Sequence, residues 1–273
     1  MSKKEISTFL GKITNGNSAD VLSQMESNCI DLVVTSPPYD NLRDYGKDAA
    51  WNFESFKKIA KQLYRVVKEG GVVVWVVGDS VVKGAKSLTS FKQALYFQQL
   101  GFNMYDIIIY EKAGTAPPHK NRYFNAYEYM FVLSKGIPNT INLIEDKPNI
   151  WANHSTYGEV TRREQDGSLT PKGKKIVKPF GVRTNIWRYA NGKGFATKDD
   201  IAYQHPAIFP EKLVADHIIS WSNEGDIVLD PFMGSGTTAK KAIELNRKWV
   251  GIEISKEYCE IANQRLELVC TEQ

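Results

Sequence analysis

Two short segments carry residue types and spacings with which this chain could do chemistry. The first is Asp230-Pro-Phe-Met-Gly-Ser-Gly-Thr-Thr238, which follows the apolar run Ile227-Val228-Leu229. A glycine turn between a strand and a helix lets the backbone approach a ligand closely at the helix N-terminus. Glu253 lies 19 residues after Gly234, near the end of a second apolar run, where an acid can accept hydrogen bonds from both hydroxyls of a ribose. The segment is therefore typical of a nucleotide-like ligand site in a β-α-β unit.

The class of nucleotide depends on Asp230. The residues Gly234-Ser-Gly-Thr-Thr-Ala239 formally fit a dinucleotide fingerprint, so a nicotinamide or flavin cofactor has to be weighed. A carboxylate between the strand and the glycines repels a pyrophosphate but suits a cationic ligand such as S-adenosylmethionine. A phosphate-binding P-loop is excluded, because no Gly-Lys-Ser/Thr follows the glycines. The residues favour S-adenosylmethionine, while another nucleotide and a merely structural turn stay open.

The second segment is Thr35-Ser36-Pro37-Pro38-Tyr39, which follows the β-branched run Ile30–Val34. Two consecutive prolines can neither continue a strand ladder nor enter a helix interior, so the backbone is locked open at the strand end. We expect a rigid platform that exposes the Ser36 hydroxyl, the Pro37 carbonyl and the Tyr39 ring in one small space. The alternative is an ordinary Pro-Pro strand terminator.

An α/β pattern of helices and strands must position these two segments. Apolar periodicity predicts helices over 20–25, 53–67, 91–100, 211–221, 238–246 and 255–268, and strands over 30–34, 72–77, 105–110, 127–133, 227–230 and 249–254. We expect Gly70-Gly71 to end the second helix and a serine to cap the last helix. We expect the strand over 127–133 to pair antiparallel with a neighbour.

The order of these elements is permuted. A doubly wound domain needs further strands after the ligand-binding unit, but the chain ends soon after it, so the earlier strands must complete the sheet. In a continuous sheet the glycine turn and the Ser36 segment would end neighbouring strands at the same edge. The expected fold class is α/β, with a Rossmann-like, doubly wound, mostly parallel sheet in permuted order.

Composition limits the classes of protein that remain. The 273 residues are 42% hydrophobic, which is ordinary for a globular chain. No apolar run approaches the roughly 20 residues that cross a bilayer, and the N-terminus lacks the apolar core of a signal peptide. The three cysteines form no C-x-x-C pair, which suggests a reducing cytoplasm. His205 precedes a proline and reads as a turn residue, so we expect no metal site.

Positive charge is concentrated in one stretch. The net charge is only +4, yet residues 147–198 contain 11 Lys/Arg against 3 Asp/Glu. Periodicity fades over 140–203, and the aromatic residues Trp151, Tyr157, Trp187 and Tyr189 are interspersed there. Such loops could follow a phosphate backbone and present side chains to base edges. The alternative is a solvated insertion with satellite core aromatics.

The motifs and their order together resemble those of bacterial DNA amino-methyltransferases of the permuted β class, which modify cytosine N4 or adenine N6. In that class a Thr-Ser-Pro-Pro-Tyr motif precedes a variable target-recognition region, and Asp-Pro-Phe-x-Gly-Ser-Gly-Thr-Thr comes last. The segment 205–213 also looks like the part of these enzymes that closes over the methionine moiety. The resemblance covers most of the chain outside roughly 140–203.

This resemblance implies a role for each matching residue. The catalytic loop would be Ser36, Pro37, Pro38 and Tyr39. The residues expected to bind S-adenosylmethionine are Asp230, Pro231, Phe232, Gly234, Ser235, Gly236, Thr237, Thr238, Glu253, Phe209, Lys212 and Asn17. Asn17 is a departure, because similar enzymes usually carry Asp after the glycine.

The expected organisation is a catalytic part over 1–139, a basic target-recognition region over 140–203 and a cofactor-binding part over 204–273. The residues expected to bind DNA are Arg162, Arg163, Lys172, Lys174 and Lys175. The expected partners are double-stranded DNA and a cognate restriction endonuclease, with a second copy of the chain as a further candidate. We expect a cytoplasmic, DNA-associated protein without membrane contact.

The expected reaction is methyl transfer to N4 of a flipped-out cytosine. Ser36 favours cytosine, because adenine enzymes of the class mostly carry Asp there. Adenine N6 stays open as an alternative. Two weaker alternatives are an enzyme that methylates a protein or a small molecule, and a DNA-binding regulator without catalytic activity. The basic region argues against a protein or small-molecule substrate. Ring-carbon methylation would need a Pro-Cys nucleophile, and none of the three cysteines follows a proline.

Overall fold

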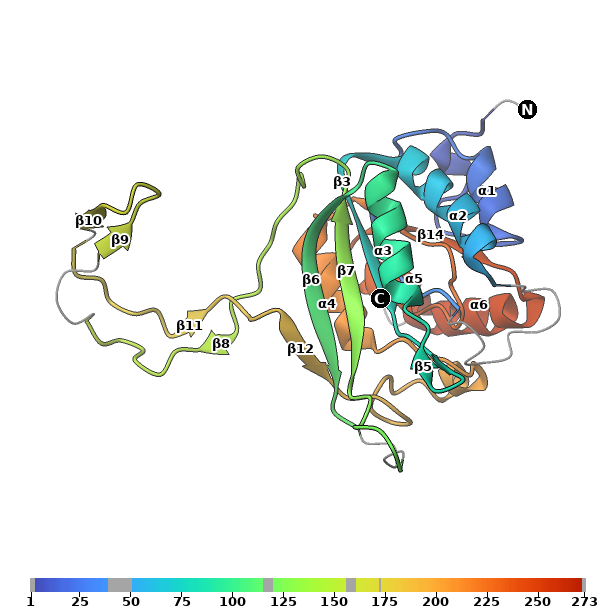
Figure 1. Cartoon of the computed structure of the whole chain (residues 1–273). Coiled ribbons are helices and arrows are strands. Elements are labelled where there is room, and N and C mark those ends of the chain that lie inside the picture. The colour runs from blue at the N-terminus through green and yellow to red at the C-terminus, as the bar shows by residue number, and fades with distance from the viewer. Residues whose placement is uncertain (1–2, 39–50, 115–119, 156–160, 172, 272–273) are drawn as a thin grey trace. The chain divides into compact units, whose positions relative to one another are not determined.

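The computed structural model describes residues 3–38, 51–114, 120–155, 161–171 and 173–271 (Figure 1). An eight-stranded sheet has the order β1-β14-β13-β2-β3-β7-β6-β12. Its strands are β1 (Ile13–Asn15), β2 (Ile30–Thr35), β3 (Val67–Val77), β6 (Asn103–Lys112), β7 (Tyr127–Ser134), β12 (Ile186–Tyr189), β13 (Ile227–Asp230) and β14 (Lys248–Glu253). Strand β7 runs antiparallel to both of its neighbours, and the other pairings in this sheet are parallel.

Helices cover both faces of the sheet. They are α1 (Ser18–Gln24), α2 (Phe53–Val66), α3 (Thr89–Gln99), α4 (Glu211–Trp221), α5 (Thr237–Glu244) and α6 (Lys256–Thr271). Phe56 and Leu63 of α2 share a buried cluster with Trp75 of β3, on the face that α1 and α3 also cover. Leu213 of α4 shares another cluster with Val74, on the opposite face. Because neighbouring β3 residues point to opposite faces, these two clusters sandwich the sheet, as expected for a doubly wound fold.

Short elements complete this part of the chain. They are two 3₁₀ turns, Ile6–Thr8 and Asp200–Gln204, and a hairpin of β4 (Val81–Val82) and β5 (Ala85–Lys86). In the described part of the chain, no helix has the length and apolar character needed to cross a membrane.

Several predictions from periodicity are confirmed. Helix α4 occupies the predicted range, β7 is antiparallel, and the Ser255 hydroxyl accepts a hydrogen bond from the Tyr258 N–H at the start of α6. The two strands β1 and β12 were not predicted. Strand β1 has only three residues and shows no alternation, and β12 lies inside the basic stretch.

The prediction that Gly70-Gly71 ends a helix is wrong. Helix α2 ends at Val66, and the chain passes directly into β3, which contains both glycines. Gly70 has φ +76°, a conformation that a side chain rarely adopts, and a Cβ on Gly71 would lie 2.7 Å from a methyl group of Val67. The glycines therefore serve an irregular strand entry beside β2, where the register shifts.

Residues 143–184 form a separate compact unit. In it, β8 (Lys147–Pro148) pairs with β11 (Phe180–Gly181), and β9 (Thr161–Arg163) pairs with β10 (Leu169–Pro171). The predicted region 140–203 extends beyond this unit, because β12 joins the main sheet beside β6. Trp187 and Tyr189 of β12 are only 7% and 4% exposed, so these two aromatics belong to the main core instead of a satellite cluster.

A buried ion-pair network holds the helices behind the glycine turn. The side chain of Arg265 in α6 is fully buried, and its guanidinium lies 2.7 Å from Asp199 and 2.6 Å from Glu211 at the start of α4. It also donates hydrogen bonds to the Ser235 carbonyl and the Thr237 hydroxyl. Burial alone would raise the pKa of Glu211, but hydrogen bonds from Lys241, Thr197 and Lys240 hold it at about 2. The network therefore fixes α4, α5 and α6 around the turn.

Replacing Arg265 should destabilise the fold. Arg265→Met removes one cation from Asp199 and Glu211 but leaves Lys240 at 2.7 and 2.9 Å from them. We therefore expect the free energy of unfolding to fall by about 2–3 kcal/mol in urea titrations. The matched control is Lys256→Met, whose ammonium group is 84% exposed and lies 3.9 Å from Glu260, and it should cost less than about 0.5 kcal/mol. Equal losses in the two variants would contradict this role.

The same network makes stability depend on pH. The folded pKa of Glu211 lies below its ordinary value of 4.5, so the stabilisation is present above that pH and is lost as the pH falls toward 2. Burial would raise the pKa of Asp199, but hydrogen bonds from Lys240 and Arg265 lower it. In the same urea titrations the difference between wild type and Arg265→Met should therefore narrow as the pH falls below 3.8, the ordinary value for this carboxyl.

Candidate active site

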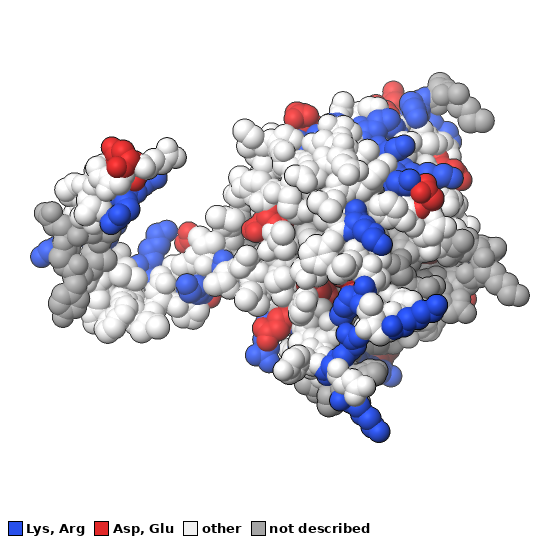
Figure 2. Space-filling model, viewed as in Figure 1, with Lys and Arg blue, Asp and Glu red and all other residues white. Residues whose placement is uncertain are grey.

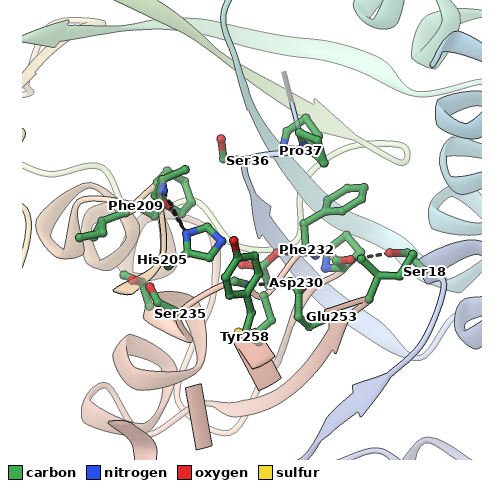
Figure 3. Close-up of a pocket in the computed structure, with 18 of the residues that line it drawn as sticks. Ser18, Ser36, Pro37, His205, Phe209, Asp230, Phe232, Ser235, Glu253 and Tyr258 are labelled. Carbon is green, nitrogen blue, oxygen red and sulfur yellow. Dashed lines mark hydrogen bonds between the residues drawn. The ribbon is translucent and has the colours of Figure 1, made fainter. Parts of the chain in front are cut away.

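The two chemical segments of the sequence meet at one edge of the sheet. Strand β13 pairs in parallel with β2, with Leu229 opposite Val33. The chain after each strand therefore leaves the sheet at the same edge, as the permuted order predicts. A cavity of about 390 Å³ lies at this edge and is lined from both segments. In Figure 3, Ser36 and Pro37 lie on one side of the cavity, and Glu253 and Tyr258 lie on the other.

Most of the predicted site residues that the structure describes line this cavity. They are Ser36, Pro37, Pro38, Asn17, Phe209, Asp230, Pro231, Phe232, Gly234, Ser235, Thr237 and Glu253. Tyr39 lies outside the described residues. Three of the residues predicted to bind the cofactor are described but do not line the cavity, namely Gly236, Thr238 and Lys212. The Lys212 side chain is 72% exposed and lies 3.4 Å from Asp216.

The carboxylate of Asp230 ties the two segments together. Its Oδ1 accepts hydrogen bonds from the Thr35 hydroxyl at 2.6 Å and from the Phe232 N–H at 3.0 Å. Its Oδ2 accepts one from the Thr238 hydroxyl at 2.7 Å, so Thr238 supports the turn from the first residues of α5. Thr35 immediately precedes Ser36, so Asp230 links the end of β2 to the end of β13.

Burial and hydrogen bonding have opposite effects on the pKa of Asp230. Removal from water raises the pKa of this carboxyl to about 6, although the Thr35 hydroxyl, the Thr238 hydroxyl and the Phe232 N–H all favour the charged form. Asp230 is therefore ionised at neutral pH, and it supplies a negative charge at the wall of the cavity.

Glu253 holds the glycine turn in a similar way. Its Oε2 accepts the Gly234 N–H at 2.8 Å, and its Oε1 accepts the Ser255 N–H at 2.9 Å. Burial raises the pKa of Glu253. Gly234 has φ +50°, and a Cβ there would lie 3.0 Å from His205 Nε2. Glycine is therefore required at this position both by the backbone conformation and by the space that the histidine ring takes.

The start of α1 forms another part of the wall. The Asn17 Oδ1 accepts the Ala19 N–H at 2.9 Å, so this side chain caps the helix while it lines the cavity. The Ser18 hydroxyl donates a 2.6 Å hydrogen bond to the Pro231 carbonyl. Helix α1 is thereby attached to the turn that follows β13.

Sequence analysis missed several residues that line the cavity. They are Ser18, Trp51, Ser55, Ile59, Tyr110, Lys112, Glu128, Asn191, His205, Tyr258 and others. His205 was interpreted only as a turn residue, yet its ring lies edge-on to Tyr258, with centroids 4.3 Å apart. The signal that could have found it is its place in the segment 205–213. Tyr258 lies on an ordinary amphipathic helix and carries no such signal.

The residues predicted to bind DNA lie in the smaller unit. Arg162 and Arg163 belong to β9, and Lys174 and Lys175 follow β10, with all four side chains exposed. Lys172 lies outside the described residues. The Arg162 guanidinium is 3.9 Å from Glu164, a distance that leaves it largely solvated. Figure 2 shows Lys and Arg side chains on the surface of this unit.

Removing the ionisable group at 230 should change how stability depends on pH. Because burial raises the folded pKa of Asp230 from 3.8 to about 6, its contribution is present below pH 3.8 and is lost as the pH rises through about 6. Relative to Asp230→Asn, the wild type should lose about 2 kcal/mol between pH 4 and 7 in urea unfolding. Parallel stability curves for the two proteins would contradict the buried carboxylate.

Comparisons with known proteins agree with this architecture. Residues 30–264 match the family model described as DNA methylase. The orphan methyltransferase M.BamHII of Bacillus amyloliquefaciens is 59% identical over 87% of this chain and 89% of its own length. The Type II methyltransferase M.BglII of Bacillus subtilis is 32% identical over 94% of this chain and 69% of its own length.

A solved structure extends the likeness to three dimensions. TTHA0409, a DNA modification methylase from Thermus thermophilus solved in complex with S-adenosyl-L-methionine, aligns with a TM-score of 0.62. The alignment covers 94% of this chain and 95% of that one, with 25% identity. This chain therefore belongs to the DNA methylase family of S-adenosylmethionine-dependent enzymes that methylate exocyclic amines of DNA bases.

Proposed function

We propose that this chain transfers a methyl group from S-adenosylmethionine to N4 of a flipped-out cytosine in double-stranded DNA, as the modification enzyme of a restriction–modification system. One observation carries the proposal. Ser36 and Pro37, which can accept hydrogen bonds from an amine, line the same cavity as residues 230–235, which contain Asp230 and the first glycine of the turn.

The cavity has the chemistry that the cofactor needs. A volume of about 390 Å³ falls in the range of small-molecule sites. The ionised Asp230 suits a ligand that carries sulfonium and ammonium charges. Glu253 accepts the Gly234 and Ser255 N–H groups, and a carboxylate has about four acceptor sites, so it can also accept a hydrogen bond from a ribose hydroxyl. Phe232 and Phe209 add apolar walls. These residues would hold the cofactor, which supplies an electrophilic methyl group.

The residues after β2 would prepare the amine. An exocyclic amine inside a duplex cannot reach a closed cavity, so the base has to leave the stack. We infer that Tyr39 stacks on the base through its ring. The Ser36 hydroxyl and the Pro37 carbonyl then accept the two N–H groups and hold the nitrogen lone pair out of conjugation with the ring.

In that orientation the lone pair faces the methyl group in a near-attack arrangement. A nitrogen–carbon bond forms as the sulfur–carbon bond breaks, and the products are N4-methylcytosine and S-adenosylhomocysteine. The surplus proton leaves through Ser36 or water. Cys29 and Cys259 are buried and do not line this cavity, and the direct transfer needs no covalent intermediate with the base.

Ser36 supports cytosine over adenine as the target, because adenine enzymes of this class mostly carry Asp at that place. Adenine N6 methylation would use the same cavity and the same cofactor. The exposed basic residues of the smaller unit support a polyanion substrate over a protein or a small molecule. The relative M.BglII is named a Type II methyltransferase, which supports a restriction–modification system, whereas M.BamHII is named an orphan.

Removing the Ser36 hydroxyl should slow the transfer without weakening cofactor binding. Ser36→Ala deletes one of two acceptors for the amine, and we expect the single-turnover rate constant of methylation to fall by about 100-fold or more. The Kd for S-adenosylmethionine, measured by calorimetry, should stay within about threefold. The matched control Ser7→Ala, at an exposed position outside the cavity, should change neither quantity. Full activity of Ser36→Ala with normal cofactor binding would disprove the role.

A further inference from the structure

A charged pair in the same cavity has no part in the transfer described above. The Lys112 ammonium lies 2.6 Å from Glu128 Oε1, and the two side chains are 21% and 15% exposed. Both residues line the cavity together with Ser36. We propose that Lys112 donates a hydrogen bond to the O2 carbonyl of the flipped cytosine and that Glu128 positions its ammonium group. This inference rests on the proposed function and names the group that selects the base.

Strand alternation places these side chains on one face of the sheet. Val34 of β2, Met130 of β7 and Tyr110 of β6 all belong to the buried cluster on the α4 face. Side chains two residues apart on a strand point to the same face. Glu128 and Lys112 each lie two residues further toward the cavity edge of their strands, on the α4 side. Ser36 directly follows the last residue of β2, and all three residues line the cavity. The cavity begins where this layer ends.

The distance between β2 and β7 suits a base held between Ser36 and the Lys112–Glu128 pair. Strands β2 and β7 both pair with β3, which puts them two strand spacings apart, or roughly 10 Å. A pyrimidine with one hydrogen bond at its amine end and another at its carbonyl end spans about the same length. With its amine at Ser36, such a ring would direct its opposite end toward Glu128 and the adjoining Lys112.

The backbone around Lys112 is fixed before any base arrives. The Lys112 N–H donates to the Ala126 carbonyl at 2.7 Å, and the Ala113 N–H donates to the Tyr189 carbonyl at 2.9 Å. The Gly114 N–H donates to the Asn191 side chain at 3.0 Å. The end of β6 is thus held from β7 on one side and from the end of β12 on the other. The ammonium group is therefore presented from a rigid support.

The chemistry of this end of the cavity distinguishes the two candidate bases. A lysine ammonium has three donors, and one of them serves Glu128. Cytosine presents its O2 acceptor beyond N3 on the edge that carries the amine, whereas adenine presents a C–H group at the corresponding place beyond N1. Cytosine therefore offers Lys112 an acceptor that adenine lacks. A site built to bond an acceptor rejects the analogue that lacks it.

The test compares cytosine with 2-thiocytosine, whose sulfur is a poor acceptor. The substrate is a DNA duplex with one modification site, which is first located by mapping the product of the wild type. The target position in that site holds either cytosine or 2-thiocytosine. We expect wild type to prefer cytosine by about 10-fold or more in kcat/KM. Lys112→Met should lower kcat/KM on cytosine by about 10- to 100-fold and abolish the preference, while Lys112→Arg keeps both. The exposed control Lys61→Met should match wild type.

Further variants separate base reading from a structural role. Lys112→Met removes the cation beside Glu128. The double variant Lys112→Met with Glu128→Gln removes both charges, and it replaces the single variant in the test if the single variant fails to fold. A structural role would shift the melting temperature or the cofactor Kd without changing the preference for cytosine over 2-thiocytosine.

Two outcomes overturn the inference, and they differ in what they do to the proposed function. If wild type yields N4-methylcytosine and the Lys112 variants retain its discrimination, only the role of Lys112 fails. If wild type yields N6-methyladenine, the cytosine proposal and this inference fail together.

Discussion

The buried carboxylate of Asp230 is the interaction on which the rest of the site depends. Three donors from three places converge on it, namely the Thr35 hydroxyl, the Thr238 hydroxyl and the Phe232 N–H. A carboxylate that is 3% exposed is costly unless such bonds compensate for the lost water. Because the donors come from β2, α5 and the turn after β13, satisfying the charge also sets the distance between the residues that would hold the amine and those that would hold the cofactor.

Other elements hold the same turn from different directions. Glu253 binds the Gly234 N–H from β14, Arg265 binds the Ser235 carbonyl from α6, and Ser18 binds the Pro231 carbonyl from α1. These contacts join residues from both ends of the chain. In the permuted order, the turn near the C-terminus is therefore held partly by residues from the N-terminal part of the chain, Ser18 and Thr35.

Sequence reasoning was most successful where one local rule decides the outcome. The periodicity of 211–221 defines a helix, and the run Val72–Val77 lies within a central strand, since burial on one or both faces leaves a clear pattern. Motif order placed the Ser36 segment and the Asp230 turn on neighbouring strands. The helix end predicted at Gly70-Gly71 was wrong, because the irregular start of β3, with its positive φ at Gly70 and little space beside Gly71, requires the glycines.

The missed residues have a common physical reason. Lys112 and Glu128 lie at the ends of two strands, and the apolar residues of these strands predict only that the strands are buried. The pairing of the two side chains depends on the register between β6 and β7. That register is a tertiary property that no local window contains. The same holds for β12, whose buried Trp187 and Tyr189 lie among basic residues and resemble a solvated loop in the sequence.

The identity of the methylated base tests the central claim most directly. The purified protein would be incubated with unmodified double-stranded DNA and S-adenosylmethionine, and the DNA digested to nucleosides for mass spectrometry. The account predicts N4-methylcytosine, formed by the amine-binding residues after β2. N6-methyladenine would keep the fold, the cofactor and the direct transfer but contradict the base assignment from Ser36. No methylated base on several DNAs would contradict the proposed substrate.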